Sequence, residues 1–537
     1  MDYFLFILIL FANNLHYPFY AGALEFPHDE GAHFADTVTS EWWYMNMDLV
    51  DETGDSFGIM LTHFRKPAVA RIFNLTDVAN NVFHSSVGIL GSLFCDTGHV
   101  FITYRNLYGT VNDTDKWTYP QDGEPFSYLV KIDDRNINVA CSLHLSAFEY
   151  PFAIDSLGIV TLGDSGNVSY YYAIPFINVQ GKLDIGNEYH RVEGIAWIDR
   201  QWGPFGVSPE GGYEWFSAIS SQNNRWLGIQ VWNLFENDSV PHSSNFRHLN
   251  IFAHTPDTSF HIFTSQFILE RLGYIFDPVS QKYFSRGWRV VWQSDSGVIL
   301  LEIHPEVDNQ IVTFVTSRFY EGITYISRIS ATFNQINFMN HADKGYGFAE
   351  LVQKYDTDII TPSTPEFAGF SYNPTSCTVR ACWHPSLAGS YPIAGYRVYF
   401  LDPQNPDHIR YFQVTRDTFI DIPSPPDSQI VLMISAFDSA SAVNGSDLAG
   451  PFIFTAVHEN YTHPYSIKIS STRYGANLDI MTDTHWNLSI VSSDGRILKR
   501  LDGIGKRRIK LKLKTGVYFT IVNNKHISKI YKFIVVR

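Results

Sequence analysis

The chain has 537 residues, of which 45% are hydrophobic, 15% aromatic and only 17% charged. This composition excludes an intrinsically disordered chain, and the length exceeds what one hydrophobic core can serve, so we expect three or four folded domains. The formal net charge is −15. Beyond the N-terminus, no run approaches the roughly 18 apolar residues that a membrane-spanning helix needs.

The N-terminus predicts a signal peptide over residues 1–23. Residues 1–12 form an apolar run of about signal-peptide length, and Ala21-Gly22-Ala23 supplies the small residues that precede a cleavage point. Export is therefore expected, with no transmembrane anchor after cleavage. The run lacks a preceding Lys or Arg and carries Asp2 instead, so the alternative is a buried strand of the first domain.

Histidines, acids and aromatic residues gather after this segment. Residues 26–30 read Phe-Pro-His-Asp-Glu, His33 follows, and residues 40–44 read Ser-Glu-Trp-Trp-Tyr. Strand-like alternation, a turn at residues 52–54 and a return strand over residues 57–64 predict a β-hairpin. No pair among these histidines and acids has the spacing of a zinc motif, so we predict no metal site.

Residues 194–203, Gly-Ile-Ala-Trp-Ile-Asp-Arg-Gln-Trp-Gly, place one acid and one base between two tryptophans. An extended strand sorts their side chains by alternation, with Trp197, Asp199 and Gln201 on one face and Arg200 and Trp202 on the other. A carboxyl beside an aromatic ring is disfavoured as an anion, so its pKa rises and it becomes a proton donor near neutral pH. The alternative is an ordinary strand that ends in a turn, with Asp199 paired or capping.

Short alternating strands and frequent turn residues, without a long amphipathic helical pattern, predict an all-β fold. Several motifs occur in a telling order: Pro-His-Asp-Glu (27–30), Glu-Trp-Trp-Tyr (41–44), Thr-His-Phe-Arg (62–65), Tyr-Tyr-Ala-Ile-Pro (171–175), the decapeptide 194–203, Tyr-Glu-Gly (320–322) and Gly-Tyr-Gly-Phe-Ala-Glu-Leu (345–351). Their order resembles the AttH-type lipocalin-like family, whose relatives include carotenoid 1,2-hydratase, also called hydroxyneurosporene synthase, and kievitone hydratase. The resemblance covers about residues 25–355.

This resemblance implies two tandem lipocalin-like antiparallel barrels, over residues 24–206 and 207–357, with an apolar pocket at or between them. It also implies an apolar small-molecule ligand such as an isoprenoid, polyene or lipid, and hydration without a cofactor as the simplest chemistry. An acid protonates an isolated double bond, aromatic faces stabilise the cation, and water adds. Asp199 would be the acid beside Trp197, and Glu41 or His33 would manage the water. The residues expected to line the ligand are Trp42, Trp43, Tyr171, Tyr172, Trp202 and Trp215.

One departure from the family pattern keeps other functions open. In the carotenoid hydratases a His-x-Trp pair precedes the corresponding Asp, whereas this chain has Tyr170-Tyr-Tyr172 there. Other hydration or isomerisation chemistry, hydrolysis of lipid-like substrates, and a carrier without chemistry therefore remain alternatives.

Three strings resemble protease motifs but are typical of turns. Residues 96–98 (Asp-Thr-Gly) and 295–297 (Asp-Ser-Gly) lie between apolar strands and lack the residues that follow in aspartic proteases. Residues 163–166 (Gly-Asp-Ser-Gly) have no triad context. We predict turns at all three.

The four cysteines do not form a disulfide framework. Cys377 and Cys382 lie five residues apart in a strand-like stretch, on opposite faces and too far apart to bridge. Pairing of Cys95 with Cys141 is left open.

A Pro/Ser/Thr linker at residues 361–365 precedes two further β-domains. Residues 364–456 resemble a fibronectin type III domain through Trp383, Gly-Tyr-Arg-Val-Tyr (395–399) and Ile-Ser-Ala-Phe-Asp (434–438). Residues 463–537 resemble a type IX secretion sorting domain through Gly-Val-Tyr-Phe (516–519) and the terminal Lys-Phe-Ile-Val-Val-Arg; the alternative is another sandwich. The second resemblance implies the secretion machinery as a partner and a secreted or cell-surface location.

The C-terminal tail is basic. From residue 486 onward 13 Lys and Arg face two Asp, a net charge of +11. These charges alternate with apolar residues, as in Ile-Lys-Leu-Lys-Leu (509–513), which is typical of a strand with one solvated face. We therefore expect no nucleic-acid partner.

Overall fold

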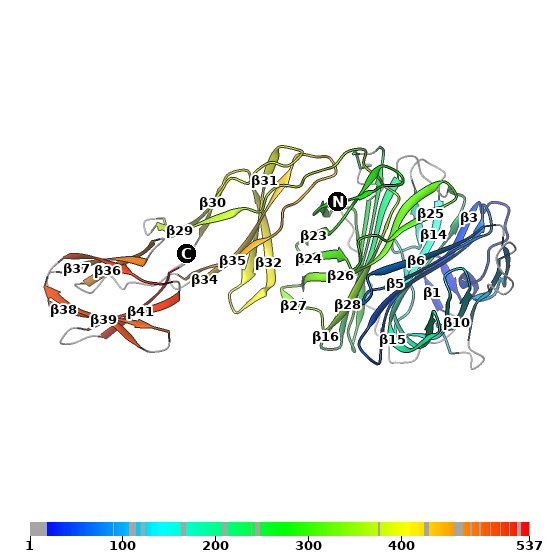
Figure 1. The fold of residues 1–537 in the computed structure, drawn as a ribbon, viewed down its shortest axis with the longest axis horizontal. Coiled ribbons are helices and arrows are strands. Elements are labelled where there is room, and N and C mark those ends of the chain that lie inside the picture. Colours follow the sequence, from blue (N-terminus) through cyan, green and yellow to red (C-terminus); the bar gives the residue numbers. More distant parts are fainter. Residues whose placement is uncertain are drawn as a thin grey trace. The chain divides into compact units, whose positions relative to one another are not determined.

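In a computed structural model the chain is all-β (Figure 1), and the predicted fold class is confirmed. The structure describes residues 19–89, 91–106, 114–119, 124–162, 168–206, 212–237, 239–241, 247–373, 376–423, 429–455, 465–472, 475–482, 485–493, 496–504, 506–514, 516–523 and 528–535. Two compact units are distinguished, Met1–Ser424 with Gln429–Phe454, and Pro425–Ser428 with Thr455–Arg537. Within the described ranges, none of the helical structure is long and apolar enough to cross a membrane.

The N-terminal part forms a thirteen-stranded antiparallel sheet. Its strands are β3 Ser40–Asp51, β4 Ser56–Lys66, β5 Ala70–Asp77, β6 Val82–Ile89, β7 Ser92–Cys95, β8 Phe101–Arg105, β9 Thr114–Thr118, β10 Ser127–Asp134, β11 Val139–Ala147, β12 Phe152–Ala153, β13 Ile159–Thr161, β14 Val168–Ile185 and β15 Glu188–Gly203. The order is β6-β5-β4-β3-β15-β14-β11-β10-β9-β8-β7, with β12 and β13 paired to β14. A two-stranded ribbon, β1 Phe19–Ala21 with β2 Leu24–Phe26, and a 3-10 turn, η1 His28–Glu30, precede it.

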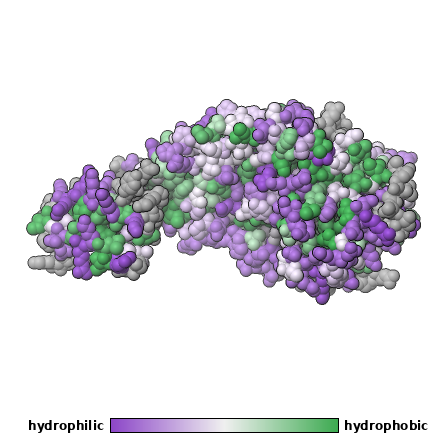
Figure 2. Space-filling view, viewed as in Figure 1, coloured by the Kyte–Doolittle hydropathy of each residue, from purple (hydrophilic) through white to green (hydrophobic). Residues whose placement is uncertain are grey.

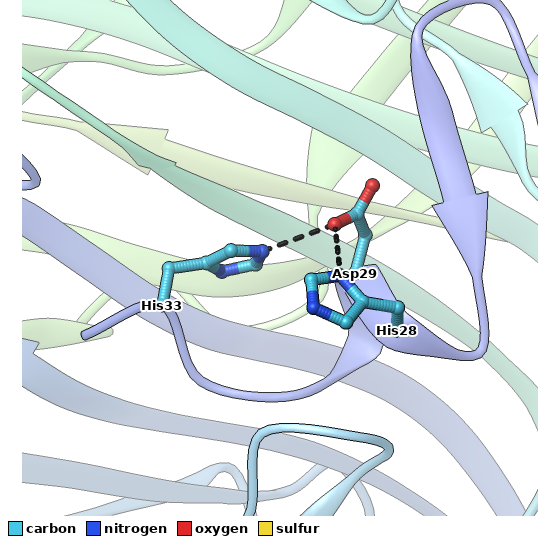
Figure 3. A group of neighbouring side chains, drawn as sticks. All are labelled: His28, Asp29 and His33. Atoms are coloured by element: carbon cyan, nitrogen blue, oxygen red, sulfur yellow. Dashed lines mark hydrogen bonds and ion pairs between the residues drawn. The ribbon is translucent and has the colours of Figure 1, made fainter. Parts of the chain in front are cut away.

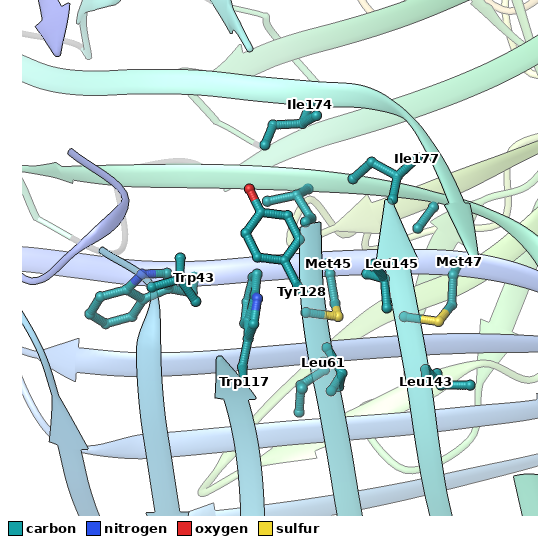
Figure 4. Close-up of a cluster of buried hydrophobic side chains, with 14 of the residues drawn as sticks. Trp43, Met45, Met47, Leu61, Trp117, Tyr128, Leu143, Leu145, Ile174 and Ile177 are labelled. Atoms are coloured by element: carbon teal, nitrogen blue, oxygen red, sulfur yellow. The ribbon is translucent and has the colours of Figure 1, made fainter. Parts of the chain in front are cut away.

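Strict alternation builds the core of this first sheet. In β11 every second residue from Val139 to Ala147 is buried, so one face of the strand is apolar throughout. Strands far apart in the sheet order, such as β5 and β8, contribute Phe73 and Ile102 to the same cluster, so the sheet curls around it. Figure 4 shows part of this core, with Trp117 and Tyr128 among aliphatic side chains.

The next part of the chain forms an eleven-stranded antiparallel sheet. Its strands are β16 Gly212–Gln222, β17 Arg225–Phe235, β18 Arg247–His254, β19 Ser259–Thr264, β20 Ile268–Arg271, β23 Trp288–Ser294, β24 Gly297–Pro305, β25 Ile311–Phe314, β26 Ser317–Phe333, β27 Ile336–Met339 and β28 Lys344–Leu351. The order is β19-β18-β17-β16-β28-β26-β24-β23-β20, with β25 and β27 paired to β26. A separate ribbon joins β21 Tyr274–Asp277 to β22 Lys282–Ser285. This second sheet encloses its own apolar core.

The two sheets pack against each other, and we call this contact the seam. It is a cluster of buried residues from both sheets, among them Tyr44, Tyr171 and Trp197 of the first and Trp215, Phe252 and Phe348 of the second. Hydrogen bonds cross it as well, among them Asn74 to Glu321 (2.9 Å), Thr76 to Gln310 (2.7 Å) and Tyr346 to Asn46 (3.1 Å). The seam therefore combines apolar packing with buried polar contacts.

A β-sandwich follows the second sheet within the same unit. One layer contains β29 Glu366–Asn373, β30 Thr378–His384 and β33 Phe419–Pro423; the other contains β31 Ile393–Asp402, β32 Asn405–Thr415, β34 Gln429–Asp438 and β35 Ala449–Thr455. Val298 and Leu300 of the second sheet share a buried cluster with Tyr399 and Met433 of the sandwich. Arg289 of the second sheet donates to the Ser446 carbonyl at 2.9 Å, and Arg397 of the sandwich donates to Glu270 of the second sheet. The sandwich is thus fixed to the second sheet by apolar and ionic contacts.

We expect this contact to stabilise the second sheet itself. Replacing Met433, which is buried in the shared cluster, with Ala should lower the free energy of unfolding by about 2–3 kcal/mol, because the cavity removes methylene contacts. Urea unfolding followed by tryptophan fluorescence measures the change. Val414→Ala, at an exposed position of the same sandwich, is the control and should change it by less than about 0.5 kcal/mol. If Met433→Ala left the free energy of unfolding of the two sheets unchanged, the sandwich would not stabilise the second sheet.

The second compact unit is a small pair of sheets. One contains β36 Tyr465–Thr472, β37 Gly475–Thr482 and β40 Arg507–Lys512; the other contains β38 His485–Ser492, β39 Ile497–Ile504, β41 Gly516–Asn523 and β42 Ser528–Val535. Leu478, Trp486 and Leu488 are buried in its core. In β40 the basic residues are exposed while Leu511 is buried. Figure 2 shows hydrophilic residues over much of the visible surface of the chain.

The structure also describes the cysteines and two of the three strings that resemble protease motifs. All four cysteines are free, so Cys95 and Cys141 are not paired. Asp96 accepts hydrogen bonds from two following backbone N–H groups in the turn between β7 and β8, and Asp295 lies in the tight turn between β23 and β24. Residues 1–18 of the expected signal peptide, and residues 163–166, lie outside the described residues.

Candidate active site

Strand β15 carries the acid singled out from the sequence. A two-residue turn, Gly186-Asn187, joins β14 to β15, and both turn residues have positive φ, as such hairpins require. A bulge at Pro175 interrupts the β14–β15 pairing, and beyond it Asp199 pairs with Ala173 of β14 and with Tyr44 of β3. Asp199 therefore lies on a central strand with its side chain in the seam.

Asp199 accepts hydrogen bonds on both carboxylate oxygens. The residue is only 4% exposed. The Trp197 indole N–H donates to Oδ1 at 2.7 Å, and the Tyr171 hydroxyl donates to Oδ2 at 2.6 Å. From the second sheet, the Gln230 amide nitrogen lies 3.4 Å from Oδ2. Donors from both sheets therefore hold this buried carboxylate.

The direction of the Tyr171 proton follows from its other partners. The Trp215 indole N–H donates to the Tyr171 oxygen at 3.1 Å, and the Gln230 amide donates to it as well. Both lone pairs of the hydroxyl are then used, so its own proton points at Asp199. This network favours the ionised form of Asp199 and opposes the effect of burial.

Burial affects the pKa of Asp199 more than these hydrogen bonds do. It raises the pKa of Asp199, the hydrogen bonds from Tyr171, Trp197 and Gln230 lower it, and the charge of Glu350 raises it further, to a pKa of about 7. A carboxyl with this pKa gives up a proton and takes one back near neutral pH.

Two further acids face the seam from the second sheet. Glu321 of β26 and Glu350 of β28 are cross-strand partners. Asn74 of the first sheet donates to Glu321 at 2.9 Å, and the Tyr213 hydroxyl donates to Glu350. Burial raises the pKa of both acids, that of Glu350 to about 7, and the charge of Glu350 raises that of Glu321 further. The pair therefore retains at least one proton at neutral pH.

Tyr44 lies among these three acids. Burial raises its pKa, and so do the charges of Glu321, Glu350 and Asp199. Since Tyr44 is the β3 neighbour of Asp199, the acids of the two sheets form one electrostatic group. We call the residues Tyr44, Tyr171, Asp199, Glu321 and Glu350 the seam acid cluster.

A chain of amides fixes the donor from the second sheet. Asn250 Nδ2 donates to Gln230 Oε1 at 2.8 Å, and His261 Nε2 lies 2.9 Å from Asn250 Oδ1. Burial lowers the pKa of His261 to about 3, so the imidazole is neutral. Its Nε2 must carry the proton that Asn250 accepts. Gln230 consequently presents its N–H groups, not its oxygen, to Tyr171 and Asp199.

The opposite face of β15 holds a different group. Arg200 donates to Glu41 at 2.5 Å, and its guanidinium carbon lies 4.0 Å from the Trp43 ring centre. Burial raises the pKa of Glu41, but Arg200, His33 and Arg65 lower it more, to about 2. The His33 ring stacks on Trp202 with centroids 4.1 Å apart. Glu41 is therefore ionised and tied to arginine, on the other side of the sheet from Asp199.

The predicted site residues consequently divide into two groups. The structure brings Trp197, Tyr171 and Trp215 to Asp199 in the seam. It places the following on the opposite face, in or beside the first-sheet core: Glu41, His33, Trp43, Tyr172 and Trp202. Trp42 pairs with Gln201 across β3 and β15 and packs on Phe205 at the edge of the seam, with ring centroids 5.3 Å apart.

Comparison with known proteins decides the family. The sequence profile described as AttH-like matches residues 19–354, which is more than half of the chain. The chain belongs to the AttH-like family. No curated protein matches it. Among solved structures, one assigned as AttH from Nitrosomonas europaea is 19% identical, covers 62% of this chain and 98% of its own, and has a TM-score of 0.46. Kievitone hydratase from Nectria haematococca is 13% identical, covers 63% of this chain and 98% of its own, and has a TM-score of 0.43.

A cavity of this AttH-like chain lies elsewhere along the contact between the sheets. Its volume is about 420 Å³, and it is lined by Asn81 in the β5–β6 turn, Phe83 of β6, Arg286 before β23, and Pro305 of β24 with residues 306–309 that follow it. Gln310, next to this lining, bonds Thr76 across the seam. The cavity does not adjoin Asp199, whose surroundings are filled by Trp197, Tyr171 and Gln230.

Sequence reasoning missed Gln230, Glu321 and Glu350. Both glutamates lie in strings quoted for the family resemblance, 320–322 and 345–351, without a role assigned to them. One signal was available: Tyr346, Phe348 and Glu350 alternate along one face of a strand, so an acid shares an apolar face. Gln230 carries no such signal, because its contact with Tyr171 depends on the packing of two sheets.

Proposed function

We propose that this AttH-like protein binds an apolar small molecule at the seam and hydrates an isolated double bond, with Asp199 as the proton donor. One observation carries the proposal: a carboxyl with a pKa of about 7 is buried among Trp197, Tyr171 and Trp215. Membership in the AttH-like family supports it. The ligand class is an isoprenoid, polyene or lipid.

The steps balance in atoms and charge. The Asp199 carboxyl transfers its proton to one alkene carbon, and the other carbon becomes a tertiary cation. The faces of neighbouring indole rings stabilise that cation. Water then adds to it, and the resulting oxonium loses a proton to the Asp199 carboxylate, which restores the starting acid. The donors on Asp199 stabilise the carboxylate that exists between these two transfers.

Access to Asp199 requires side chains of the seam to move. Trp197, Tyr171 and Trp215 are buried around the acid, and an apolar ligand would replace their mutual contacts with its own. A carrier that binds the same ligand without chemistry is the second candidate, because donors already engage both oxygens of the carboxylate. Hydrolysis of a lipid-like substrate is the third; the paired acids Glu321 and Glu350 support it.

The proposal includes export and two accessory domains. Residues 1–23 would be a cleaved signal, residues 364–456 a fibronectin type III-like module, and residues 463–537 a sorting-like domain that engages secretion machinery. Layered β-sheets in both C-terminal regions support this assignment. Deleting residues 463–537 should stop release or surface display in the native host; unchanged export would refute the sorting role.

The function is tested by ligand extraction followed by isotope labelling. Apolar compounds that co-purify with the full chain are identified by mass spectrometry and returned to the apoprotein in H₂¹⁸O. A hydratase adds one water and incorporates one ¹⁸O per product. Bound ligand without product supports the carrier, ¹⁸O in a cleaved ester supports the hydrolase, and a chain that binds no apolar compound contradicts the proposal.

A further inference from the structure

Three side chains near the N-terminus converge outside the proposed active site. They are His28 and Asp29 of η1 and His33 in the loop that follows (Figure 3). One ligand atom from each lies within 4.8 Å of the other two. Among the described residues, no other three His, Cys, Asp or Glu side chains bring their ligand atoms this close together.

The distances suit a shared metal ion. Asp29 Oδ1 lies 3.1 Å from His28 Nδ1 and 3.1 Å from His33 Nε2. Donor atoms bound about 2.0–2.2 Å from one ion are about 3–3.5 Å apart, so two edges of a coordination polyhedron are already formed. The third edge joins the two imidazole nitrogens. Rotation of the His28 side chain, which is 63% exposed, brings its nitrogen to the same distance from that of His33.

Asp29 and His33 are each held by a neighbouring group, and each keeps one atom free to bind a metal ion. The Glu25 backbone N–H donates to Asp29 Oδ2 at 2.7 Å and leaves Oδ1 facing the histidines. His33 Nδ1 lies 3.1 Å from Glu41 Oε1, which leaves Nε2 facing Asp29. A carboxylate behind a metal-binding imidazole fixes its tautomer and orientation and raises its basicity. Stacking on Trp202 fixes the plane of the same ring.

The surrounding charges are compatible with a cation. Arg65 and Arg200 both bond the Glu41 carboxylate, so their charges are directed at Glu41 and not at Asp29. Arg200 Nη2 also lies 3.4 Å from His33 Nδ1, on the side of the ring that faces away from Asp29. The open side of the cluster, at His28, faces solvent.

We propose that His28, Asp29 and His33 bind one divalent transition-metal ion of the Zn²⁺ type, with Glu41 orienting His33. Two imidazoles and one carboxylate leave at least one coordination position for water. The spacing of the three residues matches no zinc motif. The 3-10 turn and Gly31 bring their side chains together, whereas the regular spacing of a strand or helix does not. The site lies on the opposite face of β15 from Asp199, so its existence does not depend on the proposed function.

Metal binding by the full chain tests the proposal. After removal of metal with a chelator, titration with ZnCl₂ in a calorimeter should give one tight site per chain. His28→Ala should weaken it at least about tenfold, since losing a ligand costs no less than losing a residue that orients one. Asp29→Asn, which keeps the side-chain shape, should weaken it similarly. Co²⁺ should show the visible absorption of an ion bound by nitrogen and oxygen.

His341→Ala is the matched control. His341 also lies beside an acid, with Nε2 3.0 Å from Asp343, and is 59% exposed. Removing it should leave the tight site unchanged. The proposal is overturned if Zn²⁺ shows no saturable site, or if His341→Ala weakens binding as much as His28→Ala does. Circular dichroism of each variant shows that it is folded, so a weakened site is not mistaken for an unfolded chain.

Discussion

Asp199→Asn is expected to lower turnover of a hydrated substrate by about 10²–10⁴-fold, because the variant has no proton to transfer. Ligand affinity should change by less than about threefold. The side chain keeps its shape and its Oδ1 still accepts from the Trp197 N–H, although its amide nitrogen cannot accept the Tyr171 proton as Oδ2 does. Turnover is measured with the compound identified by extraction, and affinity by quenching of tryptophan fluorescence.

Asp48→Asn is the matched control for this substitution. Asp48 lies on β3, and burial together with the charge of Glu306 raises its pKa to about 7 as well. It is absent from the network that holds Asp199. The control should therefore keep wild-type turnover. If the two variants lose turnover equally, the loss reflects the stability of the sheet, and Asp199 has no special part in the chemistry.

Asp199→Asn should also change the dependence of stability on pH. An acid whose folded pKa lies above its unfolded value stabilises the fold fully below the unfolded value, about pH 4. That contribution disappears as pH rises to the folded pKa, here about 7. Each such acid therefore removes about 1.4 kcal/mol of unfolding free energy per pH unit between pH 5 and 7. Relative to wild type, the variant should gain about 2 kcal/mol across this window, because the slope falls to half at the folded pKa.

The comparison between variant and wild type isolates this effect. Burial lowers the pKa of His248 to about 4 and that of His261 to about 3, and neutral buried histidines add stability as pH rises from 5 to 6.5. Their contribution has the opposite sign and cancels in the difference. Glu350→Gln should show the same upward trend, because its pKa is also about 7. Urea unfolding at intervals of half a pH unit gives the curves, and a difference that is flat with pH would refute the raised pKa.

The sequence predicted the faces of β15 because alternation in an extended strand is local. Trp197 and Asp199 do share one face, and Arg200 and Trp202 share the other. The same rule was not applied to Trp42 and Trp43, which are adjacent and therefore point to opposite sides of β3. Both were assigned to one ligand site, and the structure separates them.

The rest of the candidate site depends on contacts between distant strands. Gln230 reaches Tyr171 from 59 positions along the chain, and Asn74 reaches Glu321 from 247. The alternation of residues within one strand does not show which face of one sheet will pack against which face of another. Glu41 and His33 were grouped with Asp199 as the residues that would manage the water, but a sheet one residue thick lies between them and Asp199.

The most direct measurement of the central claim is the pKa of Asp199 itself. Infrared difference spectra of protein labelled with ¹³C-aspartate follow the carboxyl band as pH changes, and Asp199→Asn identifies which band belongs to this residue. We predict a protonated carboxyl whose titration midpoint is near pH 7. A midpoint near pH 4 or below would show that the donors outweigh burial, and Asp199 would then be a structural anion with no proton to give.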